Sequence, residues 1–491
     1  MSLALAARAA GQQAARPPER PNILVIISDQ LAQRAVGAYG DRWASTPNID
    51  SLAAGGVRFS RSYTNCPLCQ PSRASFWTGR LPHETGVDSN GLNYPVPIIP
   101  LSMPTLGAVF SAAGYETVNF GKQHDAGALR GFRLVEPEEV ELEAPEAWPV
   151  NNDSRQDPAA ARKCVEFLKG PHQKPFLAVA SLNNPHNICG WVGHNVGVHR
   201  DLPVPGELPP LPDNFEIDDL ASRPLPIQYL CCSHRRLQQA AKWSETNYRH
   251  YLAAYYHYLE MADTLVGEIL QALYSTPQGE NTLVVFFADH GDSMASHRMV
   301  TKQVSFYEET SRVPFILAGP GVGGRGRLVG EPLVSLLDLL PTLCDYAGLA
   351  VPGGLQGTSL LPWVRGDNPG KAPEYVAGEW QTEWGYTVSP GRMIRTDRYK
   401  YTRYLEGDGE ELYDLASDPG EKRNLAPEQS YAAALAGHRD LLQEHLQKTA
   451  DPFFSLEVKA DRRWRSHEPG YWNHEGLSAP EAAWEEEEKN R

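Results

Sequence analysis

NILVIISDQ, residues 22–30, gives the main indication of the fold, because an apolar run of strand length ends there abruptly in polar residues. Three later stretches share this design: YETVNFGKQH at 115–124, PFLAVASLNNPH at 175–186 and TLVVFFADHGD at 282–292. Continuous apolar runs are typical of strands covered on both faces. Between them lie helical patterns, of which residues 247–273 are the clearest. The alternation predicts an α/β fold, with a large, mostly parallel mixed sheet between helix layers.

The second half of the chain suggests a smaller unit. The Pro/Gly-rich RGDNPGKAPE, 365–374, predicts a boundary, and short strand-like runs with turns at 407–409 and 418–420 follow it. The helical pattern at 431–448 completes a small α+β subdomain with a short antiparallel sheet. We therefore expect four parts: a lead-in or export-signal remnant at 1–20, a main domain at 21–368, a C-terminal subdomain at 369–450 and a charged extension at 451–491.

Composition limits the partners. The chain has 491 residues and a formal net charge of −15, which argues against nucleic acid and against attraction to anionic membranes. Seven cysteines are too few for a disulfide scaffold, and the first 20 residues lack an apolar core long enough to span a membrane. We expect a protein without a membrane anchor, with a periplasmic or secreted location favoured over the cytoplasm.

Two of the strand ends carry metal-type ligands. Asp29 and Gln30 follow the first apolar run, and Asp289 and His290 follow the fourth. Because ligands bind beyond the carboxyl ends of strands in such sheets, these side chains could converge. Carboxylate and amide oxygens suit Ca²⁺ or Mg²⁺, and a histidine leaves room for Mn²⁺ or Zn²⁺. The alternative for each pair is simple capping of a turn or helix.

The other polar clusters supply cations. Lys122 and His124 lie in GKQH, His186 ends NNPH, and Lys302 lies in TKQVSFYEE. Gathered at one crevice they would bind a tetrahedral oxyanion and stabilise charge on a leaving oxygen. Each taken alone is more often an ordinary solvated or packed residue.

The stretch TNCPLCQPSRASFWTGR, 64–80, contains two overlapping cysteine patterns. Pro71 is suited to the first turn of a helix, so Cys69 is expected just before the helix start, where backbone N–H groups favour anions. Arg73, one turn inside, could pair with an anionic substrate or a metal ligand. Read from Cys66 the stretch is instead C-x-x-C, a redox or zinc spacing. The chain lacks a thioredoxin-like layout and a second C-x-x-C pair, so both of these alternatives are weak.

CQPSRASFWTGR resembles the signature of the sulfatase family, and the other motifs follow in the family's order, including PNILVIISDQ, GYETVNFGKQH, NNPH, ADHGD and ELYDLASDPGEKRNLA. The resemblance covers most of the chain. It implies an alkaline phosphatase-like fold and hydrolysis of an organic sulfate monoester to an alcohol and inorganic sulfate. The substrate would be a small-molecule or glycan sulfate ester, and residues 21–368 would form the catalytic domain.

The resemblance also implies roles for the clusters. Cys69 would be oxidised to formylglycine by a formylglycine-generating enzyme and then serve as the nucleophile. A cation, usually Ca²⁺ with Mg²⁺ or Mn²⁺ possible, would be bound by Asp29, Gln30, Asp289, His290 and the modified Cys69. Arg73 and Lys122 would hold the nucleophile, and His124 would be the base of the elimination step. His186 and Lys302 would bind sulfate and assist the departing oxygen.

The chain departs from the common family pattern at two positions. Many sulfatases have a second Asp at the position of Gln30 and Asn at the position of His290, whereas relatives that cleave phosphonate monoesters or phosphodiesters also use Gln and His. A phosphonate or phosphodiester hydrolase is therefore the enzymatic alternative, and a non-catalytic sulfated-glycan binding protein is a further one. Trp191, His194, His199 and Arg200 are candidates for the substrate rim, with local packing as the alternative.

Overall fold

The computed structural model describes residues 20–90, 98–136, 156–195, 207–216, 223–224, 226–227, 240, 243–302, 305–367, 371–381, 390–405 and 409–456. The expected lead-in therefore lies outside the described residues except for residue 20, and the extension is described only for 451–456. Among the described residues, no helix is both long and apolar enough to cross a membrane.

A mixed sheet of eight strands forms the centre of the molecule. Its spatial order is β5 (Arg133–Val135), β4 (Glu116–Gly121), β6 (Phe176–Leu182), β1 (Asn22–Ser28), β7 (Thr282–Ala288), β8 (Phe315–Ala318), β2 (Val57–Phe59) and β9 (Arg327–Val329). The strands from β5 to β7 run parallel, and β8 is antiparallel to both of its neighbours. The four predicted strands are the consecutive β4, β6, β1 and β7, so the predicted α/β class is confirmed.

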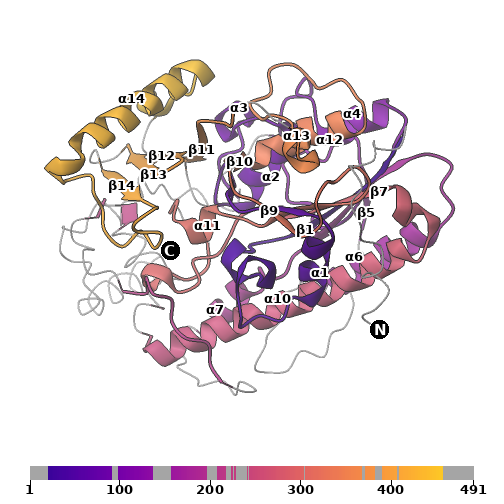
Figure 1. Cartoon of the computed structure of the whole chain (residues 1–491), viewed down its shortest axis with the longest axis horizontal. Coiled ribbons are helices and arrows are strands. Elements are labelled where there is room, and N and C mark those ends of the chain that lie inside the picture. The colour runs from indigo at the N-terminus through magenta and orange to yellow at the C-terminus, as the bar shows by residue number, and fades with distance from the viewer. Residues whose placement is uncertain are drawn as a thin grey trace, which may run out of the picture.

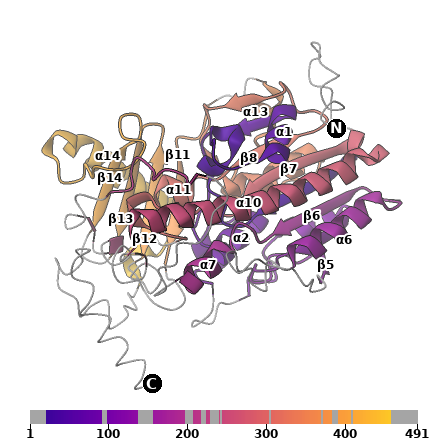
Figure 2. The ribbon, with the colours of Figure 1, turned by 90° about the horizontal axis from the view of Figure 1, so that it is seen from below.

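Helices cover both faces of this sheet, as Figures 1 and 2 show. One layer contains α1 (Pro47–Gly55), α6 (Asp157–Lys169), α7 (Ile188–Asn195) and α10 (Glu245–Tyr274). The other contains α2 (Cys69–Thr78), α3 (Pro82–Thr85), α4 (Leu106–Ala112), α12 (Leu339–Tyr346) and α13 (Leu361–Arg365). The short helix α11 (Glu308–Ser311) precedes β8. The strands β3 (Ser62–Tyr63) and β10 (Val334–Ser335) pair with each other in a separate two-stranded sheet.

The long helix α10 follows its predicted pattern. It begins with a capping box between Ser244 and Asn247, and the apolar residues at helical spacing from Leu252 to Ile269 are buried. Because both faces of the sheet are covered, β1, β6 and β7 are buried along their whole length. Two-sided burial explains why their sequences are continuously apolar.

The register of the central strands brings their ends together. Ser28 lies opposite Leu182 on one side and Ala288 on the other, and Gly121 lies opposite Ser181. The next residues along each chain segment therefore emerge at one edge of the sheet. The expected convergence of the polar clusters follows from this register.

The C-terminal part is a four-stranded antiparallel sheet of β11 (Tyr375–Trp380), β12 (Gly391–Thr396), β13 (Tyr399–Tyr404) and β14 (Glu410–Asp414), covered by α14 (Ala432–Thr449). This matches the predicted strand-and-helix content of the small α+β unit. The sheet contacts the main sheet's elements through buried ion pairs, such as that of Lys400 with Glu308 at 2.9 Å. The exact division of the chain into domains at 368/369 stays a prediction.

Candidate active site

Cys69 is the first residue of α2. The preceding Leu68 is extended, so the helix begins at Cys69 itself and not one residue later, as the position of Pro71 had suggested. Pro71 is the third helical residue, still within the first turn, where its missing N–H costs no hydrogen bond. The Cys69 side chain is buried and lies at the positive end of the helix.

A four-residue cluster surrounds the sulfur of Cys69. Ligand-type atoms of Asp29, Cys69, Asp289 and His290 all lie within 4.8 Å of one another, and all four residues are buried. The Cys69 Sγ is 3.1 Å from His290 Nε2 and 3.7 Å from Asp29 Oδ1. The cluster therefore offers two carboxylates, an imidazole and the side chain at position 69 to a single point.

This donor set fits a divalent cation. The Nδ1 of His290 donates to the Gly291 carbonyl oxygen at 2.8 Å, which directs Nε2 at the cluster, where the neutral ring would offer its lone pair to a cation. The two buried carboxylates bring negative charge that a cation would neutralise. Oxygen-rich sets of this kind bind hard divalent ions.

Arg73 forms ion pairs with both carboxylates of the cluster, those of Asp29 and Asp289. Its Nη2 donates to Asp29 Oδ2 and its Nε donates to Asp289 Oδ2, both at 2.8 Å, while Nη1 donates to Ser181 Oγ at 2.9 Å. Lys122 Nζ also lies 2.8 Å from Asp29 Oδ2. Each aspartate thus gives Oδ2 to a cationic side chain and turns Oδ1 towards the interior of the cluster. Of the two roles considered for Arg73, the structure shows pairing with the metal-type carboxylates.

The surrounding charges shift the pKa values of the cluster. Burial would raise the pKa of Asp29, but Lys122 and Arg73 lower it well below its usual value. Burial and the charge of Asp29 oppose ionisation of Cys69, yet Lys302, Lys122 and His290 together lower the pKa of its thiol. The site therefore favours an anion at position 69.

His186 and Lys302 also face Cys69. Both side chains interact with its sulfur, and Lys302 Nζ donates to Gln30 Oε1 at 2.9 Å. Burial, with the charges of Lys302 and Lys122, lowers the pKa of His186 to about 3, so this imidazole is neutral near pH 7. A neutral imidazole and an ammonium group therefore both interact with the side chain at position 69.

His124 stands further out than the other candidates. Its Nε2 faces the backbone oxygen of Asn90 at 3.5 Å, and no contact between described residues joins it to Cys69. Asn90 in turn accepts from Gln70 N through its side chain at 3.0 Å, beside the start of α2. His124 therefore approaches the site through Asn90 and is half-buried.

The C-x-x-C alternative finds no support in the described part of the chain. Cys66 and Cys69 are both free, and Cys69 lies among Asp and His side chains. Burial, followed by the charge of Glu379, raises the pKa of Cys66 well above its usual value, which leaves an inert thiol. Among the rim candidates, Trp191 is buried and packs edge-on against Trp243, so it belongs to the interior. His194, His199 and Arg200 lie outside the residues whose side chains are described.

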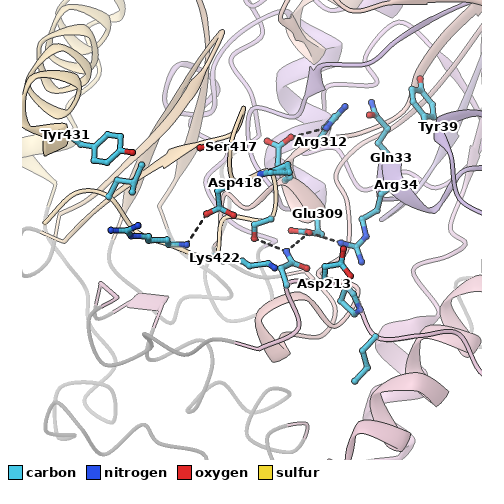
Figure 3. Close-up of a pocket in the computed structure, with 18 residues that line it drawn as sticks. Gln33, Arg34, Tyr39, Asp213, Glu309, Arg312, Ser417, Asp418, Lys422 and Tyr431 are labelled. Atoms are coloured by element: carbon cyan, nitrogen blue, oxygen red, sulfur yellow. Dashed lines mark hydrogen bonds and ion pairs between the residues drawn. The ribbon is translucent and has the colours of Figure 1, made fainter. Parts of the chain in front are cut away.

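A separate cavity of about 900 Å³ opens between the main sheet's elements and the C-terminal sheet (Figure 3). No candidate active-site residue lines it. Two ion pairs lie in its lining: Arg34 contacts Glu309 at 2.8 Å, and Arg312 contacts Glu308 at 3.3 Å. This cavity is therefore not the candidate active site, despite its size.

Several residues that support the cluster were not predicted. Ser181 holds Arg73, Ser72 Oγ donates to the Asp289 backbone oxygen at 2.6 Å, and Asp292 accepts from Gln30. Asp292 lies within the strand-end stretch ADHGD, which was the available signal. The serines carried no signal, because a lone serine in a buried strand or helix is common.

An α/β sheet with a buried acidic cluster around a cysteine at a helix N-terminus defines a hydrolase of the sulfatase type, and the chain belongs to the sulfatase family. The profile described as Sulfatase matches residues 21–349, and that described as N-sulphoglucosamine sulphohydrolase, C-terminal, matches residues 295–449. The chain is a sulfuric ester hydrolase, as the resemblance implied. Enzymes of this family generally use a metal ion and formylglycine.

The chain is 52% identical over 482 residues to a Delta 4,5-hexuronate-2-O-sulfatase of Bacteroides thetaiotaomicron, covering 98% of this chain and 99% of the relative. A solved structure of a 2-O GAG sulfatase superposes with a TM-score of 0.90 at 52% identity, covering 94% of this chain and 99% of that one. A phosphonate monoester hydrolase of Agrobacterium radiobacter superposes with a TM-score of 0.71 at 24% identity over 89% and 97% of the two chains. The last similarity shows the fold alone, so the comparisons favour sulfate over phosphonate esters.

Proposed function

We propose that this sulfatase removes the sulfate ester from O2 of a hexuronate residue in a sulfated glycan. The 52% identity to a hexuronate-2-O-sulfatase, over nearly the whole of both chains, carries this proposal. The similarity to a choline-sulfatase of Rhizobium meliloti is weaker, at 30% identity. The glycan substrate is therefore preferred to a choline ester.

Cys69, converted to formylglycine by a formylglycine-generating enzyme, is the proposed nucleophile. The observation that supports it is the convergence of the acidic cluster, Lys302 and His186 on the Cys69 sulfur. The hydrated aldehyde supplies one hydroxyl to attack sulfur and a second whose deprotonation releases sulfate. A plain thiol or hydroxyl has no such exit from a covalent sulfate ester.

The proposed cation is Ca²⁺. Asp29, Asp289 and His290 would hold it together with the modified residue 69, because most of these donors are hard oxygens. The side-chain amide of Gln30, the further expected ligand, is instead engaged by Asp292 and Lys302. The cation would stabilise negative charge on the nucleophile and on a sulfate oxygen. Mg²⁺ and Mn²⁺ suit the same types of donor and are compared in the test below.

The remaining side chains have proposed roles in proton transfer and charge. Lys122 and Arg73 hold the acidic cluster in place, as their contacts with Asp29 support. Lys302 and His186 bind the sulfate and stabilise the departing alcohol oxygen. His124 is the proposed base of the elimination step, reached from α2 through Asn90.

Two measurements test the proposal. Peptide mass spectrometry across Cys69, after co-expression with a formylglycine-generating enzyme, reports the modification. The matured enzyme is then assayed on disaccharides that differ only in the sulfate position, O2 of the hexuronate or O6 of the hexosamine, with Ca²⁺, Mg²⁺ or Mn²⁺ after chelation. Faster turnover of the O6 ester would contradict the proposed substrate, and full activity of unmodified enzyme would contradict the nucleophile.

A further inference from the structure

The backbone of Gln30 is held in a constrained conformation just behind the cluster. Its φ is 66°, in the left-handed region that non-glycine residues rarely adopt. Its N–H donates to Asp289 Oδ1 at 3.1 Å, and its carbonyl oxygen accepts from the Tyr255 hydroxyl at 2.8 Å. The same hydroxyl accepts from Ala32 N at 3.0 Å. These contacts stabilise a backbone that would otherwise be unfavourable.

The side-chain amide of Gln30 has a single orientation that satisfies its neighbours. Its Nε2 donates to Asp292 Oδ2 at 2.7 Å, and its Oε1 accepts from Lys302 Nζ at 2.9 Å. A carboxylate only accepts and an ammonium group only donates. A flipped amide would place its NH₂ against the ammonium group and its oxygen against the carboxylate.

Asp292 is itself fixed by two donors. Its Oδ1 accepts from the Tyr251 hydroxyl and from Met294 N, the latter at 2.8 Å, and the residue is fully buried. The Tyr251 hydroxyl also accepts from Thr301 N at 2.8 Å, immediately before Lys302. Tyr251 and Tyr255 lie one turn apart on α10, so one rigid helix anchors both the Gln30 segment and the segment that ends at Lys302.

The segment between Asp292 and Lys302 needs such anchoring. Five of its residues have φ between 47° and 64°, namely Met294, Ala295, His297, Arg298 and Thr301. Left-handed conformations at non-glycine residues each cost of order 1–3 kcal/mol and persist only where the surrounding structure enforces them. The position of Lys302 at the end of this segment is therefore set by specific contacts more than by local preference.

We propose that Asp292 is a positioning residue of this sulfatase: it fixes the amide of Gln30 so that the amide oxygen holds the Lys302 ammonium group beside Cys69. This inference rests on the proposed role of Lys302. Without the Asp292 carboxylate, the Nε2 end of the amide loses its acceptor, and the contact with Lys302 is left to hold the orientation. The amide and the ammonium group are then less firmly fixed beside the nucleophile.

A charge-neutral swap tests this pairing. In Asp292→Asn, the donors Tyr251 and Met294 require the amide oxygen of the new residue, so its NH₂ faces Gln30 Nε2 and forces that amide to flip. In Gln30→Glu, two carboxylates face each other. In the double variant Asp292→Asn/Gln30→Glu, the NH₂ of Asn donates to one oxygen of the Glu carboxylate and Lys302 donates to the other, so the pattern is restored.

Each single variant should lower kcat about 10- to 100-fold, with a smaller change in KM. This is the range for residues that orient the side chains of a site by hydrogen bonds. The double variant should recover to within about tenfold of the parent. Recovery distinguishes positioning from general damage, because a merely structural defect would accumulate in the double variant. Asp263→Asn is the matched control: Asp263 is another buried aspartate, which accepts from Ile49 N at 2.8 Å, and its loss should lower the melting temperature but leave kcat unchanged.

Crystal structures of the unmodified variants provide a readout independent of turnover. We expect the contact between Lys302 Nζ and the residue 30 side-chain oxygen to be lost in Asp292→Asn and restored in the double variant. Persistence of that contact in Asp292→Asn, or a double variant no better than the worse single one, would overturn the inference. If Asp292→Asn does not fold, Tyr251→Phe and the double variant carry the same test, with a smaller loss of kcat expected for Tyr251→Phe.

Lys302→Ala separates this inference from the proposed function. Unchanged kcat in Lys302→Ala would reject the role of Lys302 and the inference together. A low kcat in Lys302→Ala combined with no rescue in the double variant would reject the inference alone. If the parent itself turns over no sulfate ester, the proposed function fails, and the crystallographic contact still decides whether Asp292 sets the amide.

Discussion

Replacing Arg73 with methionine should destabilise the protein strongly, because it removes the guanidinium group that joins two buried carboxylates. Asp29 would keep its contact with Lys122, whereas Asp289 would keep two backbone N–H donors, from Gln30 and His290, and a long contact with His290 Nε2 at 3.9 Å. Removing one partner of a buried ion pair typically costs about 3–5 kcal/mol. We expect a loss in this range in the absence of divalent cations, with the uncompensated Asp289 as the main contribution.

Urea unfolding at pH 7, with chelator and with Ca²⁺, measures the effect. The deficit of Arg73→Met should shrink when Ca²⁺ is added, because a cation bound at the cluster neutralises the same carboxylates. Arg133→Met is the control: Arg133 forms a solvent-exposed pair with Glu116 at 3.5 Å, for which about 0–1 kcal/mol is expected. A loss for Arg73→Met no larger than that of the control would refute the reasoning about the buried pair.

Three further outcomes are expected. Cys69→Ala should abolish turnover and leave the melting temperature nearly unchanged; normal activity in a purified sample would reject the nucleophile. Burial opposes protonation of His83, but its hydrogen bond to Glu379 at 2.7 Å raises its pKa to about 9 from 6.5. The stabilisation from the charged imidazole is fully present below pH 6.5 and is lost as pH rises through 9, so the stability difference between the parent and His83→Gln should shrink at alkaline pH in urea titrations; a pH-independent difference would argue against the charge. Matched aryl esters should show higher kcat/KM for sulfate than for phosphonate, and the reverse order would revive the phosphonate alternative.

Much of the fold followed from the sequence because two-sided burial leaves a direct trace. β6, β1 and β7 read as continuous apolar runs, and together with β4 they proved to be consecutive neighbours in the sheet. The convergence of their polar ends needed only the rule that ligands bind beyond the carboxyl ends of strands. The start of α2 was predicted one residue late, because Pro71 is compatible with several positions in the first helical turn.

The contacts that orient the site could not be predicted in the same way. Gln30 meets Asp292 and Lys302, residues more than 260 positions away, and no local pattern encodes such a meeting. Tyr251 and Tyr255 fit the helical spacing of α10, so they read as core residues. Their rings do pack in the interior, but their hydroxyl groups contact Asp292 and Gln30 at the site. Helical spacing predicts the burial of a ring and does not predict the hydrogen-bond partner of its hydroxyl group.

The electrostatics of the site reconcile an acidic protein with an anionic substrate. The net charge of −15 is spread over the whole chain, and its field is screened beyond about 8 Å at physiological ionic strength. At the site Lys302 and the positive end of α2 lie much closer than that to the Cys69 sulfur, in an interior that screens charges weakly. The buried aspartates direct one oxygen each to Arg73, and Asp29 also to Lys122, which leaves Lys302 bound to a neutral amide. The partner of Lys302 is thus the neutral amide of Gln30 and not a carboxylate. Because this partner carries no charge, the positive charge of Lys302 stays available to a sulfate group.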